Sequence, residues 1–155
     1  MEESFDTRRI GLDRLSLGHP RRHVLHTYRR DGCQVVVLRG ELDLYTGPAL
    51  RRLMREIAQS DPVARVVVDM TELSFLDSSG LGVLIGGLRR LRASGGSMHL
   101  AGCRGPVRDV LTITGLHQAF PIHDDLPRAL AAAAGLSGPA GPSHDADDPS
   151  PSTGV

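Results

Sequence analysis

Apolar residues with strand spacing alternate with apolar residues with helix spacing between about residues 22 and 134. Val66-Val67-Val68 is a short continuous apolar run, which is typical of a strand covered on both faces. The segment before it carries one helical stripe, formed by Leu50, Leu53, Met54 and Ile57. Because alternating strands and helices build a sheet with helices packed on it, we expect one α/β domain with a mixed β-sheet and about four helices.

Turn and capping residues mark where these elements begin and end. Strands over Val24–Tyr28 and Gln34–Arg39 flank Asp31-Gly32, a dipeptide that favours a tight hairpin turn. Thr46-Gly47-Pro48 is typical of a helix start, with Thr46 as candidate N-cap and Pro48 in the first turn. Further helices are expected over about 79–93, from 105 to just before Gly115 and from 126, and further strands around 66–68 and over 97–101.

Composition divides the chain into three parts. Residues 1–21 mix acidic and basic side chains with few apolar ones, so we expect a flexible N-terminal extension. Residues 22–134 form the domain. Residues 135–155 contain four Pro and four Gly and too little apolar surface to offset chain entropy, which predicts a disordered tail.

Charge and composition restrict the classes of function. The 18 acidic residues balance 18 basic residues, all of them Arg, so neither a nucleic-acid nor a membrane partner is predicted. The absence of lysine excludes P-loop and Schiff-base chemistry. The acidic start lacks the apolar region of a signal peptide, and the longest apolar stretch, Leu81–Leu88, is too short to span a membrane. We therefore expect a cytoplasmic protein in which Cys33 and Cys103 are reduced and buried.

The segment Leu73–Gly82 contains the candidate functional motif, Asp77-Ser78-Ser79-Gly80, directly before a predicted helix. Ser and Asp are favoured there because their oxygens accept hydrogen bonds from the unpaired N–H groups of the first turn. Simple capping explains one such residue, whereas three in a row leave at least one hydroxyl exposed. Two interpretations stay open: helix capping, or a serine phosphoacceptor whose phosphate adds about −1.5 to −2 charges.

A second candidate segment lies at the end of the preceding strand, around Glu41 and Asp43. Because the strand-to-helix junctions of parallel strands gather at one sheet edge, Asp43 is expected beside Asp77-Ser78; alternatively, it simply caps the following helix. Gly82, Gly86 and Gly87 interrupt the helix after the motif, and either tight packing within the domain or contact with a partner explains them.

Gly40-Glu41-Leu42-Asp43 together with Leu73–Gly82 closely resembles the STAS domain of bacterial anti-sigma factor antagonists, over about residues 22–134. The resemblance implies a mixed sheet with helices on one side. It also implies that the unphosphorylated protein binds an anti-sigma factor serine kinase and frees a sigma factor. Phosphorylation reverses this binding, and a PP2C-type phosphatase restores it. Ser78 is then the phosphoacceptor. The implied partner-binding positions are Asp43, Thr46, Asp77, Ser79, Gly80 and Gly82.

Enzymatic functions fit these residues poorly. A serine hydrolase needs a G-x-S-x-G elbow, but Leu76 stands two residues before Ser78. The chain has no Gly-rich phosphate loop for a kinase, and its seven histidines show no fixed pairing with a serine. We therefore expect no enzymatic activity, cofactor or metal. The alternative function is a STAS scaffold or sensor component of a stress-signalling assembly, without a phosphorylation switch.

Overall fold

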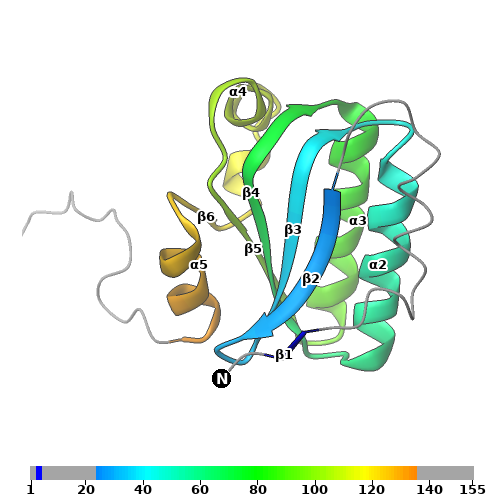
Figure 1. The fold of residues 1–155 in the computed structure, drawn as a ribbon, viewed down its shortest axis with the longest axis vertical. Helices are drawn as coiled ribbons and strands as arrows, with labels where there is room; N and C mark the ends of the chain where they lie inside the picture. Colours follow the sequence, from blue (N-terminus) through cyan, green and yellow to red (C-terminus); the bar gives the residue numbers. More distant parts are fainter. Residues whose placement is uncertain (1–2, 5–23, 136–155) are drawn as a thin grey trace, which may run out of the picture.

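The computed structural model describes residues 3–4 and 24–135, which contain one six-stranded sheet. The strands lie in the sheet in their chain order (Figure 1). Pairing is antiparallel between the first three strands and parallel between the last four, so the expected mixed sheet is confirmed. The strands are β1 (Glu3–Ser4), β2 (Val24–Arg30), β3 (Cys33–Leu42), β4 (Arg65–Leu76), β5 (Ser97–Ala101) and β6 (Ile122–His123).

The β2–β3 hairpin turns where the sequence predicts. Asp31 has φ of 54° and Gly32 has φ of 78°, as the favoured two-residue hairpin turn requires of both central residues. β3 and β4 both extend beyond the predicted strands, to Leu42 and Leu76, and these two residues are paired in the parallel register. The two strands therefore end side by side.

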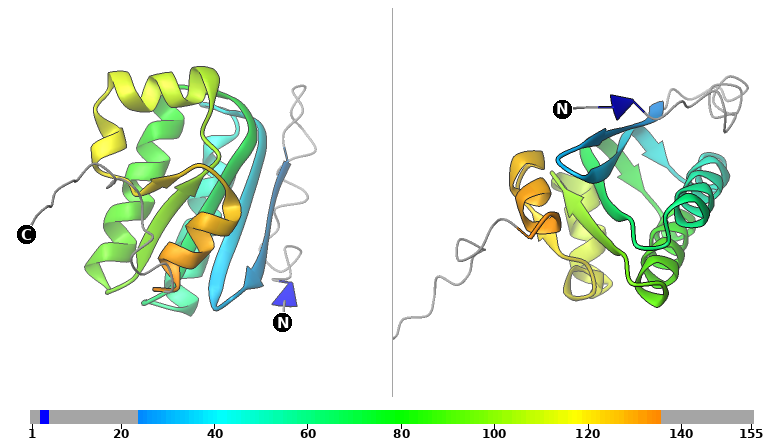
Figure 2. Two further views of the ribbon diagram at one scale, coloured as in Figure 1. Left: turned by 90° about the vertical axis from the view of Figure 1, so that its left-hand side faces the viewer. Right: turned by 90° about the horizontal axis from the view of Figure 1, so that it is seen from below.

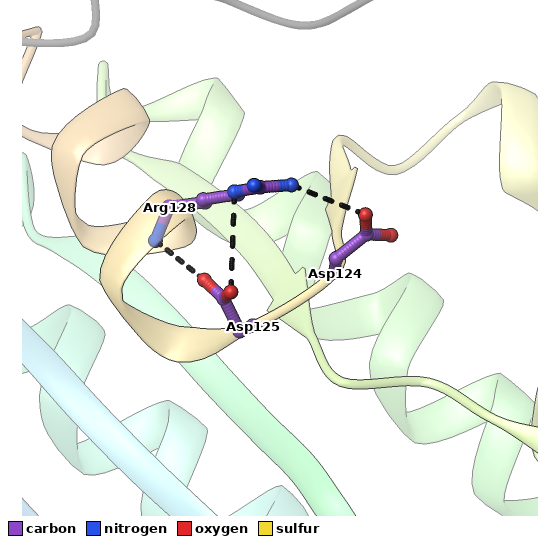
Figure 3. Close-up of polar contacts among 3 residues, drawn as sticks. All are labelled: Asp124, Asp125 and Arg128. Carbon is purple, nitrogen blue, oxygen red and sulfur yellow. Dashed lines mark hydrogen bonds and ion pairs between the residues drawn. The ribbon is translucent and has the colours of Figure 1, made fainter.

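Within residues 24–135, four α-helices cover the sheet, as expected: α2 (Gly47–Ser60), α3 (Ser78–Ala93), α4 (Gly105–Ile113) and α5 (Leu126–Ala133). A 3₁₀ turn, η2 (Leu116–Gln118), follows α4. At the start of α5, Asp125 Oδ1 accepts the Arg128 N–H at 3.0 Å, and the Arg128 guanidinium pairs with Asp124 at 3.3 Å (Figure 3). Asp125 therefore caps α5, which begins at Leu126 as the sequence predicts.

The expectation that the helices lie on one side of the sheet is wrong. Figure 2 shows α5 on one face and both α2 and α3 on the other. The buried valines explain this arrangement, because successive strand residues point to opposite faces. Val66 and Val68 join the core beneath α2 and α3, whereas Val67 packs in a second cluster with Ala129 and Leu130 of α5. Both faces of the central strands are apolar, so both need a cover.

Of the predicted N-terminal extension, residues 1–21, only Glu3 and Ser4 are described; they pair with Arg29 and Tyr28 as β1. The predicted tail, 135–155, lies outside the described residues beyond Gly135.

Cys33 and Cys103 are buried free thiols, as predicted, and burial raises the pKa of Cys103 to about 11. Over the described ranges, no helix is both long and apolar enough to cross a membrane.

Candidate functional site

The candidate site lies at the edge of the sheet where β3 and β4 end, at the top of Figure 1. Asp43 follows β3 and Asp77 follows β4. The Asp77 N–H donates to the Leu42 carbonyl oxygen at 3.3 Å, which links the two strand-to-helix junctions directly. The structure therefore brings together the two segments that the sequence singled out.

Asp77 is the residue that caps α3. Its backbone is extended, and its Oδ1 accepts the Gly80 N–H at 3.0 Å. Ser78 is the first residue of the helix and is exposed, whereas Ser79 is half-buried. Within residues 24–135, neither serine hydroxyl makes a hydrogen bond, because Asp77 alone supplies the cap. Ser78 is the more accessible of the two.

Gly80 holds this first turn against β3. A Cβ atom on Gly80 would lie 2.6 Å from the Leu42 carbonyl oxygen and 2.8 Å from the Leu42 side chain. Real Cβ atoms do not approach a backbone oxygen this closely, so only glycine fits without a shift of the helix. Gly80 is buried, and its expected contact with a partner stays a prediction.

A hydrogen-bond network fixes the loop between β3 and α2. Asp43 is only 4% exposed, and its Oδ1 accepts the N–H groups of Tyr45 at 2.9 Å and Thr46 at 3.0 Å. The Thr46 hydroxyl accepts the Asp43 N–H at 2.9 Å and donates to the Glu41 carbonyl oxygen at 2.8 Å. The Asp43 and Thr46 side chains thus form hydrogen bonds within the loop. Their expected contacts with a partner stay predictions.

Thr46 is the N-cap residue of α2, as the sequence predicts, but its side chain does not cap the helix. No hydrogen bond joins the Thr46 side chain to the first turn. Its backbone is already helical, with φ of −96° and ψ of −18°, rather than extended as in a typical N-cap. Its hydroxyl turns back toward Asp43 and Glu41 instead.

Sequence reasoning missed the most exposed apolar side chains of this edge. Leu44 is 65% exposed and Tyr45 is 69% exposed, on the loop that Asp43 and Thr46 hold. Phe75, one residue before the end of β4, is 43% exposed. The sequence did contain a sign of this exposure. Leu44 and Tyr45 follow the last strand residue and fit neither the strand nor the helix spacing that would bury them.

The glycines of α3 divide between the two interpretations. A Cβ on Gly87 would lie 2.9 Å from Met98 Cε and 3.0 Å from Met54 Cε, so tight packing explains this residue. Gly82 and Gly86 are exposed, and a Cβ on either would meet nothing within 4 Å. Ser78, Gly82 and Gly86 therefore form one solvent-facing stripe at four-residue spacing. A contact between Gly82 and a partner is sterically open.

No group of three His, Cys, Asp or Glu side chains within the described part of the chain could hold a metal ion. The acidic side chains of the edge, Asp43 and Asp77, accept hydrogen bonds from backbone N–H groups.

Phosphate could be accommodated at Ser78 because the positive end of the α3 dipole lies there. The arrangement suits reversible modification of an exposed hydroxyl on a rigid support.

The STAS domain model matches residues 25–129. A curated relative from Paenibacillus polymyxa, an anti-sigma F factor antagonist, is 36% identical over 99 residues, which span 64% of this chain and 85% of the relative. The crystal structure of an anti-sigma factor antagonist from Mycobacterium paratuberculosis is similar with a TM-score of 0.65 at 33% identity, covering 76% of this chain and 98% of that one. The anti-sigma factor antagonist SpoIIAA in its unphosphorylated form gives a TM-score of 0.64 at 26% identity, covering 72% and 97%. The chain belongs to the STAS domain family and, within it, to the anti-sigma factor antagonists.

Proposed function

We propose that this protein binds an anti-sigma factor serine kinase while Ser78 is unphosphorylated, which frees a sigma factor, and that phosphorylation of Ser78 ends the binding. The observation that carries the proposal is that Asp77, and not Ser78, caps the start of α3. Asp77 supplies the cap, so the Ser78 hydroxyl is exposed and is not needed for the fold. The relatives support it by name, since one antagonises an anti-sigma F factor and another is described in its unphosphorylated form.

The modification is a phosphoryl transfer from ATP held by the kinase. Ser78 Oγ attacks the γ-phosphorus and forms a new O–P bond, while the bond from that phosphorus to the bridging oxygen of ADP breaks. The hydroxyl proton leaves to a base on the kinase. This chain supplies the acceptor and its position, whereas the kinase supplies the nucleotide and the catalytic groups. The chain itself is a regulator without enzymatic activity.

The new phosphate changes the docking surface more than the fold. It brings about −1.5 to −2 charges to a position next to Asp77, at the point of closest contact with the kinase. Within the antagonist, the positive end of the α3 dipole offsets part of this charge. Within the complex, the phosphate adds bulk and repels the phosphates of the bound nucleotide. Release of the kinase follows, with the domain still folded.

The cycle closes by hydrolysis of the phosphoserine by a PP2C-type phosphatase. Ser78 is exposed in the unbound domain, so a phosphatase can reach the phosphate once the kinase has left.

Sigma factors and anti-sigma factor kinases act in the cytoplasm, which is the location that we propose for this protein. Ser79 and Gly82 are the further positions that we assign to the docking surface, beside Ser78 on α3.

The test uses the serine kinases of the anti-sigma factor class from the bacterium that encodes this chain, each purified separately. Each is incubated with ATP and the wild-type chain, and phosphorylation is located by mass spectrometry. The kinase that modifies the chain is then titrated with Ser78→Ala, Ser78→Glu and, as the matched control, Ser60→Glu, which places the same charge at the exposed far end of α2. We expect phosphate on Ser78, tight binding of Ser78→Ala and Ser60→Glu, and weak binding of Ser78→Glu. Equal binding of all variants, with no phosphate on Ser78, would refute the switch and favour the scaffold function.

A further inference from the structure

The loop between β3 and α2 presents two large apolar side chains to solvent. Leu44 is 65% exposed and Tyr45 is 69% exposed, and they are adjacent in the chain. Exposed single apolar residues are common on proteins, whereas Leu44 and Tyr45 are two large exposed side chains in succession on one short loop. Tyrosine is also among the residues most enriched at the energetic centres of protein interfaces. We name these two side chains the loop anchor.

The loop anchor stands on a rigid base. The Asp43 carboxylate accepts two N–H groups from within the loop, and the Thr46 hydroxyl bonds both Asp43 and Glu41. Asp43 and Thr46 are nearly completely buried, so water competes little with these bonds. A preorganised loop loses less conformational entropy on binding, which makes its apolar contacts more effective.

The loop anchor lies close to the phosphoacceptor. Leu42 bonds Asp77, and Leu44 lies only two residues beyond Leu42, so its Cα is at most about 7 Å farther along the chain. A standard protein interface covers about 800 Å² of each partner, which corresponds to a disc of about 16 Å radius. A kinase interface of this size centred on Ser78 would therefore extend as far as the loop anchor.

We infer that Leu44 and Tyr45 are the hydrophobic anchor through which this chain binds its anti-sigma factor kinase, and that they determine which kinase it selects. The inference rests on the proposed function and adds the residues that supply the binding energy. The occupant is the kinase, which presents an apolar pocket beside its nucleotide site. Ser78 controls whether the complex forms, while the loop anchor contributes affinity in the unphosphorylated state.

The test measures binding and phosphorylation by the kinase identified above, using Leu44→Ser and Tyr45→Ser in the full chain. The matched control is Val63→Ser. Val63 is 60% exposed and precedes β4, so it lies at the opposite end of that strand from Asp77, about 40 Å away along its 12 residues. Tyr45→Phe keeps the ring and tests whether the apolar surface is what matters. Circular dichroism verifies that each variant is folded.

We expect Leu44→Ser and Tyr45→Ser each to raise Kd by about tenfold or more, as truncation of an interface anchor does. Tyr45→Phe and Val63→Ser should stay within about threefold of wild type. In the phosphorylation assay KM should rise while kcat is unchanged, because the anchor contributes equally to the ground and transition states. Wild-type Kd for Leu44→Ser and Tyr45→Ser would overturn the inference. If Ser78→Glu still loses binding in that case, the proposed function stands; if Ser78→Glu also binds as wild type, the function fails too.

Discussion

Asp43 offers the sharpest test of how the site is held together. Its Oδ1 accepts the N–H groups of Tyr45 and Thr46, and the Thr46 hydroxyl lies 3.2 Å away. In Asp43→Ala, water can reach the partly exposed Tyr45 N–H, but the buried Thr46 N–H loses its acceptor. A buried unsatisfied donor costs about 1–3 kcal/mol, and a hydrogen bond to a charged group contributes about 1.5–3 kcal/mol.

From these contributions we expect Asp43→Ala to lower the free energy of unfolding by about 2–4 kcal/mol. For a domain of this size the loss corresponds to a fall in Tm of about 8–16 °C. Asp43→Asn keeps an acceptor oxygen at the same place and should lose less than half as much. Urea unfolding followed by circular dichroism measures both variants against wild type.

Two results carry different meanings for Asp43. A free energy of unfolding for Asp43→Ala within about 0.5 kcal/mol of wild type, the range of an ordinary surface substitution, would refute the argument that this carboxylate holds the loop. If Asp43→Asn is as stable as wild type but binds the kinase weakly, the charge of Asp43 contacts the partner directly. The second result would establish the contact that the family resemblance implies.

Two further predictions concern α3 and the β5–β6 edge. Gly82→Ala should raise the free energy of unfolding by up to about 1 kcal/mol, because alanine favours the helix and the added Cβ meets nothing. Gly80→Ala should lower the free energy of unfolding, because its Cβ would lie 2.6 Å from the Leu42 backbone carbonyl oxygen. Thermal unfolding of the two variants checks both signs. His99 Nδ1 lies 3.0 Å from His123 Nε2, and burial lowers the pKa of His99 to about 4. Because the unfolded state takes up this proton near the ordinary value of 6.5, stability should fall as the pH decreases from about 6.5 towards 4. His99→Gln should reduce that slope in urea titrations between pH 7.5 and 5, and an unchanged slope would contradict the assignment to His99.

Local patterns in the sequence were sufficient for most of the elements. Asp31-Gly32 specifies its own turn because the required backbone angles suit those two residues. The motif around Asp77 predicts both the start of α3 and a spare hydroxyl, since capping depends only on residues within one turn. The shared edge of Asp43 and Asp77 also follows, because parallel strands end on the same side.

Features that depend on tertiary packing were not predictable in the same way. The side of the sheet that α5 covers is decided by which valines face it, and the resemblance suggested the wrong side although Val66-Val67-Val68 already indicated two covered faces. Thr46 has a residue type typical of an N-cap, but the nearby Asp43 competes for its hydroxyl. The exposure of Leu44 and Tyr45 depends on the direction in which the loop leaves the sheet.

The close fit of Gly80 against the Leu42 carbonyl has a consequence for how such a protein would behave in a cell. With the first turn of α3 fixed to the sheet, the proposed phosphorylation of Ser78 would change the surface and leave the packing beneath it intact. Proteases, which act on opened chains, would then degrade both forms at similar rates. The total amount of antagonist would stay constant while its modified fraction changes, so transcription would follow the ratio of kinase to phosphatase activity rather than the turnover of the protein.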